Sequence, residues 1–350
     1  MAIIWADNFQ TYGSSAYLND GIYSESEGNI QADQDPNIST DVLSFNNYSV
    51  DEEVRFALPG GPIATGGVAM RIYMPALPTS GYSEPLSFRD ISNVKHITIG
   101  VGTTGAISVF RGSQTGTLLG TTATPVITAS AWHHIEVKVT INDTTGSVEV
   151  RVNGVTKLSL TGVDTCASAN VAYAQIGFAN NVSAGQYQRA FDMKDLVVWD
   201  TTGSQNNDFL GSVSVFNLFT DGDSALNWDV STGTVGSDLI DETDSVDDAD
   251  YISADDTPPA ASVFTLDNLP PDIVSVKALI PVVRAAKIDG GDGNIQVGIT
   301  SNGSTDLGAD RPITSAFTYW WDVSELSPDT GVAYTPAEVD AALLQIDRTT

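Results

Sequence analysis

Apolar and polar residues alternate strictly within residues 132–160. From Ile135 to Ile141 every second residue is apolar, and residues 148–152 repeat the pattern after a turn. A period of two places one side of each segment in a core and the other side in water, as in a β-strand. Asn153-Gly154 then gives the signal for a two-residue type I′ hairpin. We therefore predict three antiparallel strands over this segment.

Short apolar segments bounded by turn residues recur through the first 200 residues. None of them shows a helical period longer than one turn. Many short antiparallel strands predict an all-β fold, here a two-sheet sandwich of jelly-roll type over residues 1–200. The further strand candidates are Val50–Leu58, Val68–Met74, Pro85–Phe88, His96–Val101, Ala106–Arg111, Thr117–Thr121, Ala172–Phe178 and Phe191–Trp199.

The chain after residue 200 predicts a second domain. Residues 201–207 are polar and contain glycine, as is typical of a linker, and residues 208–350 return to short β segments. A single helix is predicted over residues 335–346, because Thr335, Pro336 and Glu338 form a capping box with proline at the first helical position. We expect a second β-sandwich-like domain that ends in this short helix. Its strand candidates are Ser212–Phe219, Ser262–Leu266, Ile273–Val283, Gly293–Thr300 and Ala316–Val323.

The chain is strongly acidic, with 15 Lys and Arg against 44 Asp and Glu and a formal net charge of −29. Residues 1–200 carry −9 of this charge and residues 201–350 carry −20. Such a chain repels phosphate backbones and anionic lipid, which argues against nucleic acid and membrane insertion. The segment Met1–Asp7 lacks the positive region of a signal peptide, so we expect no cleaved signal.

Residues that could carry catalysis or bind a metal do not converge in the sequence. His133 and His134 are adjacent in a predicted strand and point to opposite faces, and His96 is the only other histidine. The single cysteine, Cys166, excludes an internal disulfide and a Cys-based zinc site. No nucleophile elbow and no carboxylate cluster on one strand is present, although a carboxylate pair from two different strands stays open. We therefore name no catalytic, cofactor-binding or metal-binding residue, and expect a protein that is not an enzyme.

Two further features concern ligand binding. The turn Gly290–Ile295, the pair Asp221 and Asp223, and the run from Asp238 to Asp256 with nine acids and no base offer oxygen ligands for Ca²⁺. The simpler interpretation is a hairpin turn and a solvated acidic loop, so we expect no cofactor, with Ca²⁺ the one ion left open. Trp320-Trp321 points successive rings to opposite faces, either as a sugar-stacking platform or as core and subunit contacts.

Two sets of segments resemble known families. Trp132–Val139, Gly146–Gly154 and Phe191–Asp200 resemble the central strands of concanavalin A-like (laminin G-like) sandwich domains. Asn207–Val215, Asn227–Asp229, the acidic stretch through Thr257, and Tyr319–Ala341 resemble a module of tailed-bacteriophage structural proteins. The first resemblance specifies a fold that hosts lectins, glycanases and scaffolds alike. The second implies a virion protein made in the cytoplasm of a host bacterium.

We accordingly expect a non-enzymatic structural component of a tailed-phage virion, in capsid decoration, a head fibre or the tail. Its partners would be copies of itself, as a homo-oligomer, and neighbouring capsid or tail proteins. The alternative is a receptor- or glycan-binding adhesin that uses the amino-terminal sandwich as a lectin, with a host surface glycan as partner. A third hypothesis is a sandwich-type glycanase.

Overall fold

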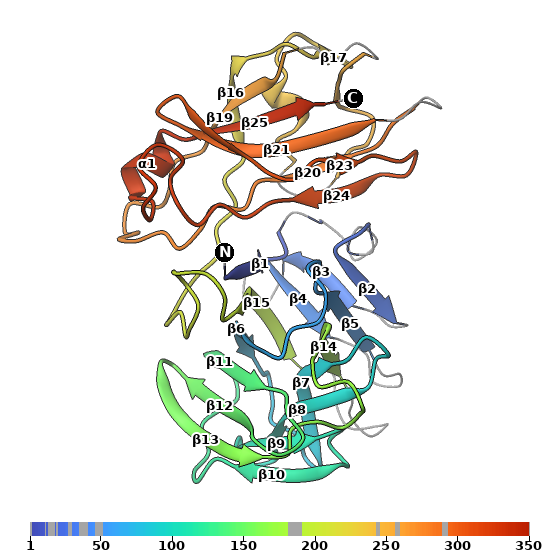
Figure 1. The fold of residues 1–350 in the computed structure, drawn as a ribbon, viewed down its shortest axis with the longest axis vertical. Helices are drawn as coiled ribbons and strands as arrows, with labels where there is room; N and C mark the ends of the chain where they lie inside the picture. The colour runs from blue at the N-terminus through green and yellow to red at the C-terminus, as the bar shows by residue number, and fades with distance from the viewer. Residues whose placement is uncertain are drawn as a thin grey trace. The chain divides into compact units, whose positions relative to one another are not determined.

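The computed structural model describes residues 2–10, 12, 18, 20–26, 30–34, 41–45, 52–180, 191–242, 246–255, 260–288 and 293–349. The chain forms two compact units, Ala2–Val215 and Phe216–Thr350 (Figure 1). The predicted fold class is confirmed: the described residues form antiparallel β-sheets with a single short α-helix. None of their helices has the length and apolar character needed to cross a membrane.

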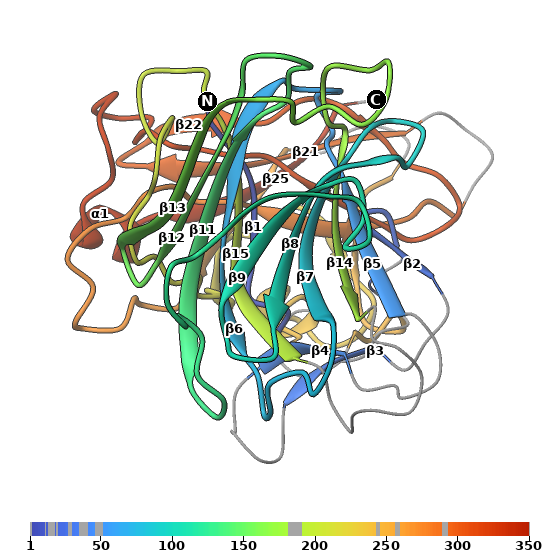
Figure 2. The same cartoon turned by 90° about the horizontal axis from the view of Figure 1, so that it is seen from below.

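The amino-terminal unit is a sandwich of two antiparallel sheets (Figure 2). The eight-stranded sheet runs in the order β13 (Val155–Val163), β12 (Gly146–Val152), β11 (Trp132–Thr140), β6 (Thr65–Tyr73), β15 (Phe191–Asp200), β4 (Asp41–Phe45) and β3 (Ile30–Gln34), and β1 (Ile3–Asp7) also pairs with β15. The seven-stranded sheet runs in the order β10 (Thr117–Thr121), β9 (Ile107–Arg111), β8 (Lys95–Gly102), β7 (Tyr82–Arg89), β14 (Gln175–Asn180), β5 (Glu52–Ala57) and β2 (Tyr23–Ser26).

Alternating apolar side chains fill the space between the two sheets. Ile135 and Val137 of β11 and Val54 and Phe56 of β5 are almost completely buried. The ring of Trp5 on β1 stacks on Phe56 from the other sheet, with 6.3 Å between their centroids. This burial of one face of each strand provides the main driving force for the sandwich.

The predicted three-strand meander is confirmed. β11, β12 and β13 pair antiparallel in sequence order. Asn153 and Gly154 have φ angles of 49° and 75°, the left-handed values that a type I′ turn requires at both central positions.

The segment that follows β15 belongs to the sandwich rather than to a linker. We call residues 207–215 the strap, because they cross the outer side of the eight-stranded sheet. The buried carboxylate of Glu136 accepts hydrogen bonds from the backbone N–H groups of Leu210 (2.9 Å) and Gly211 (3.0 Å). The Phe209 ring lies 3.6 Å from the Arg151 guanidinium carbon. These contacts explain why the division falls after Val215 and not after residue 200.

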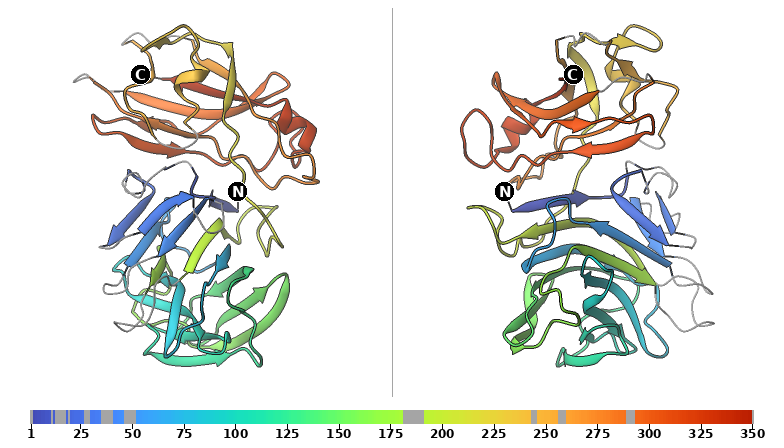
Figure 3. Two further views of the ribbon diagram at one scale, coloured as in Figure 1. Left: turned by 180° about the vertical axis from the view of Figure 1, so that it is seen from behind. Right: turned by 45° about the vertical axis from the view of Figure 1, so that its right-hand side comes forward.

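The carboxy-terminal unit is built on a six-stranded sheet (Figure 3). Its order is β16 (Thr220–Ala225), β19 (Ser262–Leu266), β25 (Leu343–Arg348), β21 (Asn294–Ser301) and β22 (Ser304–Leu307), with β23 (Arg311–Pro312) also on β21. Two further pairs are β17 (Asp229–Val230) with β18 (Ile252–Ser253) and β20 (Val282–Ala285) with β24 (Thr318–Trp321). Phe264, Ile295, Val297 and Ile346 form a core cluster against which Val283 and Trp320 of the β20–β24 pair also pack.

The predicted carboxy-terminal helix is correct at its start and wrong in its length. Thr335 caps helix α1 (Pro336–Asp340), and its capping box with Glu338 is present. Residues 343–348 are not helical, and the unit ends instead in strand β25, which pairs with β19 on one side and β21 on the other. Hydrogen bonds to two neighbouring strands outweigh a local helical pattern, which is only a weak preference.

Two strand predictions in this unit also need correction. Residues 212–219 form no strand, because their first part belongs to the strap, and β16 begins only at Thr220. Of the candidate Ile273–Val283, only the end is strand, as β20.

Candidate functional site

The outer side of the seven-stranded sheet carries a set of polar and charged residues in three rows. Residues that pair directly across antiparallel strands point to the same side of a sheet. One row joins Arg55, Gly177, Ser87 and Thr98, and the next joins Ala57, Gln175, Arg89 and Lys95. The third row joins Glu53, Ala179 and Glu84. We call Glu53, Arg55, Glu84, Ser87, Arg89, Lys95 and Gln175 the polar face.

The polar face points away from the core because its residues alternate with core residues. On β5, Glu53 and Arg55 alternate with the buried Val54 and Phe56. On β14, Gln175 and Gly177 flank the buried Ile176 in the same way. The pleat of each strand therefore fixes the direction of the polar side chains.

The carboxylate of Glu53 lies between two arginines. Its Oε2 accepts a hydrogen bond of 2.6 Å from Arg89 Nη2, and its Oε1 lies 3.2 Å from Arg55 Nε. Arg89 also donates to Ser87 Oγ (3.0 Å) and to Asn93 Oδ1 (2.8 Å). Contacts on several of its donors hold the Arg89 guanidinium in one orientation.

A second ion pair extends the polar face onto β8. Lys95 Nζ contacts Glu84 Oε1, although the two residues lie near opposite ends of their paired strands. The Lys95 side chain is 16% exposed and the Glu84 side chain 0%. Charged side chains are seldom so shielded unless they are paired, because removing a charge from water is costly.

Shielding separates the polar face from an ordinary solvent-facing sheet surface. On β13, at the edge of the other sheet, Val155 and Lys157 are exposed. On the polar face the Arg89 side chain is only 3% exposed, and Ser87 is buried. Buried ion pairs add little to stability compared with an apolar replacement, so stability alone gives no reason for this arrangement.

Gly177 provides the space that the Arg89 side chain occupies. A Cβ at this position would lie 2.7 Å from Ser87 Oγ and 2.8 Å from Arg89 Nε. Both distances are shorter than side chains tolerate, so any larger residue would displace the guanidinium from β14.

Two aromatic rings lie beside the charged rows, at the β8–β9 end of the sheet. Tyr82 and Phe110 form an edge-to-face pair with 4.9 Å between centroids. Both rings lie over glycines: a Cβ on Gly100 would be 3.2 Å from each ring's nearest atom, and a Cβ on Gly102 would be 3.3 Å from Tyr82. The partly exposed Tyr82 therefore lies over two glycines of β8, next to the polar face.

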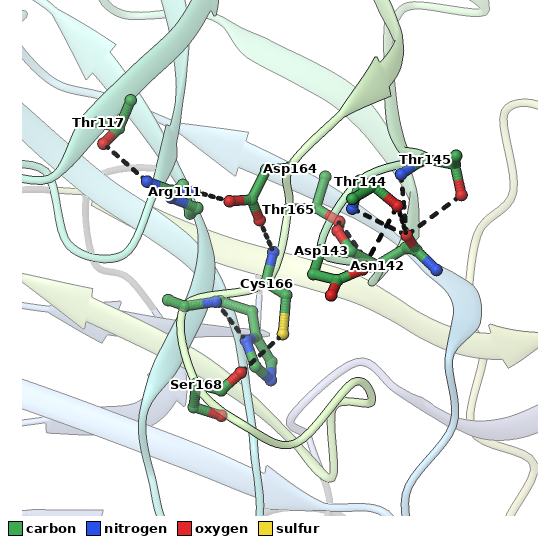
Figure 4. A network of polar contacts seen from close by, with 12 residues as sticks. Arg111, Thr117, Asn142, Asp143, Thr144, Thr145, Asp164, Thr165, Cys166 and Ser168 are labelled. Atoms are coloured by element: carbon green, nitrogen blue, oxygen red, sulfur yellow. Dashed lines mark hydrogen bonds and ion pairs between the residues drawn. The ribbon is translucent and has the colours of Figure 1, made fainter.

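The connection from β13 to β14 is held by a network of polar contacts, shown in Figure 4. Arg111 of β9 pairs with the Asp164 carboxylate, and Asp164 Oδ1 accepts the backbone N–H of Cys166 at 3.0 Å. The Cys166 thiol donates to the carbonyl of Ser168 at 3.0 Å. This connection leads directly into β14 and so fixes the position of Gln175 on the polar face.

The three histidines serve the fold. His96 Nδ1 accepts the backbone N–H of Ala167 (3.0 Å) and its Nε2 lies 3.2 Å from the carbonyl of Ala172, so the ring joins β8 to the same connection. Burial lowers the pKa of His96. His133 and His134 point to opposite sides of β11, as expected. Burial, and secondarily the charge of Arg71, lower the pKa of His134 to about 4.

The acidic candidates form no metal centre in the described part of the chain, where no group of three His, Cys, Asp or Glu side chains could hold an ion. Asp223 accepts the backbone N–H groups of Gly236 (2.9 Å) and Ser237 (2.7 Å), and Asp221 accepts the Thr265 hydroxyl. Residues 290–292 of the turn, and residues 243–245 and 256 of the acidic run, lie outside the described residues.

The two tryptophans of the candidate aromatic platform, Trp320 and Trp321, lie on opposite sides of β24. Trp320 packs against the core cluster of the carboxy-terminal unit, and the Arg311 guanidinium lies 5.8 Å from its ring centroid. Trp321 pairs with Val282 on the opposite side of β24.

The sequence analysis missed the polar face. Its five charged residues are divided among β5, β7 and β8, so no single strand shows a cluster of charges. The alternation of Glu53 and Arg55 with apolar residues predicts that both point away from the core. The strands that lie beside β5 cannot be predicted in this way, because β14 lies about 120 residues away in the sequence and pairs with both β5 and β7.

Comparisons with known proteins match the fold at low similarity. No protein-family model and no curated protein matches the sequence. Alginate lyase Aly36B is 12% identical, covers 55% of this chain and 95% of its own, and has a TM-score of 0.40. A Trypanosoma rangeli sialidase is 13% identical over 56% of this chain and 30% of its own, with a TM-score of 0.38. Domain 4 of AbnA, a GH43 extracellular arabinanase from Geobacillus stearothermophilus solved with arabinotriose, is 16% identical over 57% of this chain and 93% of its own, with a TM-score of 0.36.

These comparisons contradict two expectations from the sequence. The similar structures named above are glycan-active proteins, and none of them is a phage structural protein. The prediction of a non-enzymatic structural component of a phage virion is therefore wrong, as is the prediction that the chain is not an enzyme. Of the segments that resemble virion proteins, residues 207–215 form the strap and Tyr319–Ala341 contains part of β24 and helix α1, and a sandwich fold hosts many roles. At TM-scores of 0.40 and below, the likeness by itself assigns no activity to this chain.

Proposed function

We propose that the protein binds carbohydrate through the polar face of its amino-terminal sandwich. The observation that carries the proposal is a set of paired but partly exposed charged side chains, Glu53, Arg55 and Lys95, on the outward side of a sheet beside the aromatic pair Tyr82 and Phe110. Ligand sites combine a few fixed polar groups with apolar and aromatic surface. Sugars have both kinds of surface, since hydroxyl groups surround a ring whose C–H groups pack against aromatic faces.

The polar face offers donors and acceptors in positions fixed by other contacts. Arg89 is buried and is itself held by Ser87 and Asn93, so it fixes the partly exposed Glu53 carboxylate, which does not need to be ordered when a ligand binds. A group that is already ordered loses little entropy on binding, and this favours affinity. Glu53 and Glu84 add carboxylates from two different strands to the same face.

The test is glycan binding with and without the aromatic surface. The protein is applied to an array of plant, algal, bacterial and animal polysaccharides, and binders are measured by calorimetry. Tyr82→Ala should weaken binding about two- to ten-fold, because stacking on one aromatic ring contributes about 0.5–1.5 kcal/mol beyond the buried area. The control is Tyr251→Ala in the carboxy-terminal unit, where the tyrosine is 43% exposed and lies outside the polar face.

The same incubations are examined for shortened or unsaturated products, since the face carries two carboxylates. Binding with no products identifies a binding module, and products that disappear in Glu53→Gln identify a glycan-processing enzyme. The proposed role of this face is contradicted if the protein binds none of the polysaccharides. It is also contradicted if the Tyr82→Ala variant binds as tightly as the unaltered protein.

A further inference from the structure

We infer that the polar face selects carbohydrates that carry carboxylate groups, the class of uronic-acid polysaccharides. This inference rests on the proposed function and adds the chemical class of the ligand. It starts from Arg55 on β5 and Gln175 on β14, which lie in adjacent rows of the polar face. Arg55 pairs with Gly177, and Gln175 pairs with Ala57 in the next row.

Arg55 provides a charged donor that is partly open to a ligand. Its side chain is 24% exposed, and its shielded Nε pairs with Glu53 at 3.2 Å without making a hydrogen bond in the part of the chain that the structure describes. A shielded charged donor left without a hydrogen bond is costly. A guanidinium is also the side chain best suited to a carboxylate, because its planar set of N–H groups matches the two oxygens.

Gln175 provides the complementary acceptor. Its Oε1 is shielded and accepts no hydrogen bond from any residue that the structure describes. A neighbouring hydroxyl group would satisfy this oxygen. A donor for a carboxylate beside an acceptor for a hydroxyl is the pattern that a uronic acid residue presents, whereas a neutral sugar has no partner for the guanidinium charge.

The charge balance of the face points the same way. Arg55, Arg89 and Lys95 outnumber Glu53 and Glu84 on the polar face, while the chain as a whole carries −29. A locally cationic face in a strongly acidic protein favours an anionic group at that place alone. Added salt screens both the attraction at this face and the repulsion from the rest of the acidic chain. The affinity for an anionic ligand should therefore fall less with salt than it does in an ordinary cation–anion complex.

The experiment compares each acidic polymer with its own uncharged form. Polyglucuronate, polygalacturonate and polymannuronate are measured against the full-length protein, together with the same polymers after carboxyl reduction to neutral sugars. At least one acidic polymer should bind about ten-fold or more tightly than its reduced form, because a hydrogen bond to a charged group is worth about 1.5–3 kcal/mol.

Arg55→Gln should remove this preference, lowering affinity for the acidic polymer about ten- to a hundred-fold while leaving the reduced polymer within about three-fold. The matched control is Lys157→Gln, which makes the same charge change at an exposed position on β13 of the other sheet. If Arg55→Gln does not fold, Gln175→Glu replaces it, and the added negative charge should lower binding of the acidic polymer alone.

The outcomes separate the two proposals. Equal binding of acidic and reduced polymers overturns the selectivity for carboxylates and leaves carbohydrate binding in place. Preference for the acidic polymer that survives both Arg55→Gln and Gln175→Glu overturns the assignment to these residues. Absence of binding to every polymer, charged or neutral, overturns the proposed function itself.

Discussion

Asp7 makes the stability of the amino-terminal sandwich depend on pH in the mildly acidic range. This residue ends β1 in the eight-stranded sheet, and it is buried. Its Oδ2 accepts the hydroxyl groups of Tyr12 (2.7 Å) and of Tyr23 (2.8 Å) on β2 of the other sheet. Its Oδ1 accepts the backbone N–H of Phe9 (2.7 Å). Burial raises the pKa of Asp7 from 3.8 to about 6, although these hydrogen bonds oppose the shift.

The sign and size of the effect follow from the pKa shift. A raised pKa means that the folded state binds the proton more tightly than the unfolded state, so the ionised carboxylate destabilises the fold at neutral pH. The cost is absent below about pH 4 and complete above the folded pKa of about 6. At 1.36 kcal/mol for each pKa unit, the full cost is about 3 kcal/mol, of which about 1.3 kcal/mol is recovered between pH 7 and pH 5.

The assay is urea unfolding at several pH values between 4.5 and 8, in parallel for the protein and for Asp7→Asn. Asparagine has the same shape, keeps an acceptor for the Phe9 N–H, and can donate to a tyrosine hydroxyl. Acidification also reduces repulsion among the many other carboxylates, but both proteins share that effect. The difference between their free energies of unfolding therefore isolates Asp7. From pH 7 to pH 5 the protein with Asp7 should gain about 1.3 kcal/mol of unfolding free energy relative to Asp7→Asn.

Two parallel curves would refute this reasoning. A difference between the two proteins that does not change with pH would mean that Asp7 has the same proton affinity in the folded and unfolded states. A difference that changes in the opposite direction would mean that the hydrogen bonds from Tyr12 and Tyr23 outweigh burial and lower the pKa.

Three further substitutions test contacts in the two units. Glu136→Ala removes the acceptor for two strap N–H groups and should cost about 2 kcal/mol of unfolding free energy, with faster proteolysis of the strap, whereas Glu136→Gln should restore most of both. Gly67→Ala would place a Cβ 2.3 Å from the Trp199 ring, so thermal unfolding should show a loss of about 1–3 kcal/mol; an unchanged midpoint would contradict the packing. Thr335→Ala removes the cap of α1 and should cost about 1 kcal/mol, while Thr335→Ser should be nearly neutral by the same measurement.

Local signals in the sequence predicted local structure well. The alternation over residues 132–160 and the Asn153-Gly154 turn gave three strands, and Thr335 gave the helix cap, because each depends on residues close in the chain. The end of α1 was missed since residues 343–348 are held by strands β19 and β21, which are distant in the sequence.

The polar face could not be assembled from the sequence for the same reason. Each of its strands was predicted, but the chemistry arises only when β14 lies between β5 and β7 and brings Glu53 close to Arg89. Shielding is likewise a property of the folded surface. It distinguishes Arg89, which is buried, from Lys157, which is not, although both lie on strands of similar pattern.

The order of the strands has a consequence for how the chain folds during synthesis. β15 supplies the neighbour of β6 and β4 in the middle of one sheet, and β14 joins β5 to β7 in the other. Neither sheet is complete until residues 175–200 have left the ribosome, and the strap follows only at residue 215. Contacts between residues so far apart in the chain slow folding, and the emerging β6 and β7 expose unpaired edges in the meantime. A nascent chain stalled before residue 175 should therefore depend on a chaperone to stay soluble, whereas one stalled well beyond residue 215 should not.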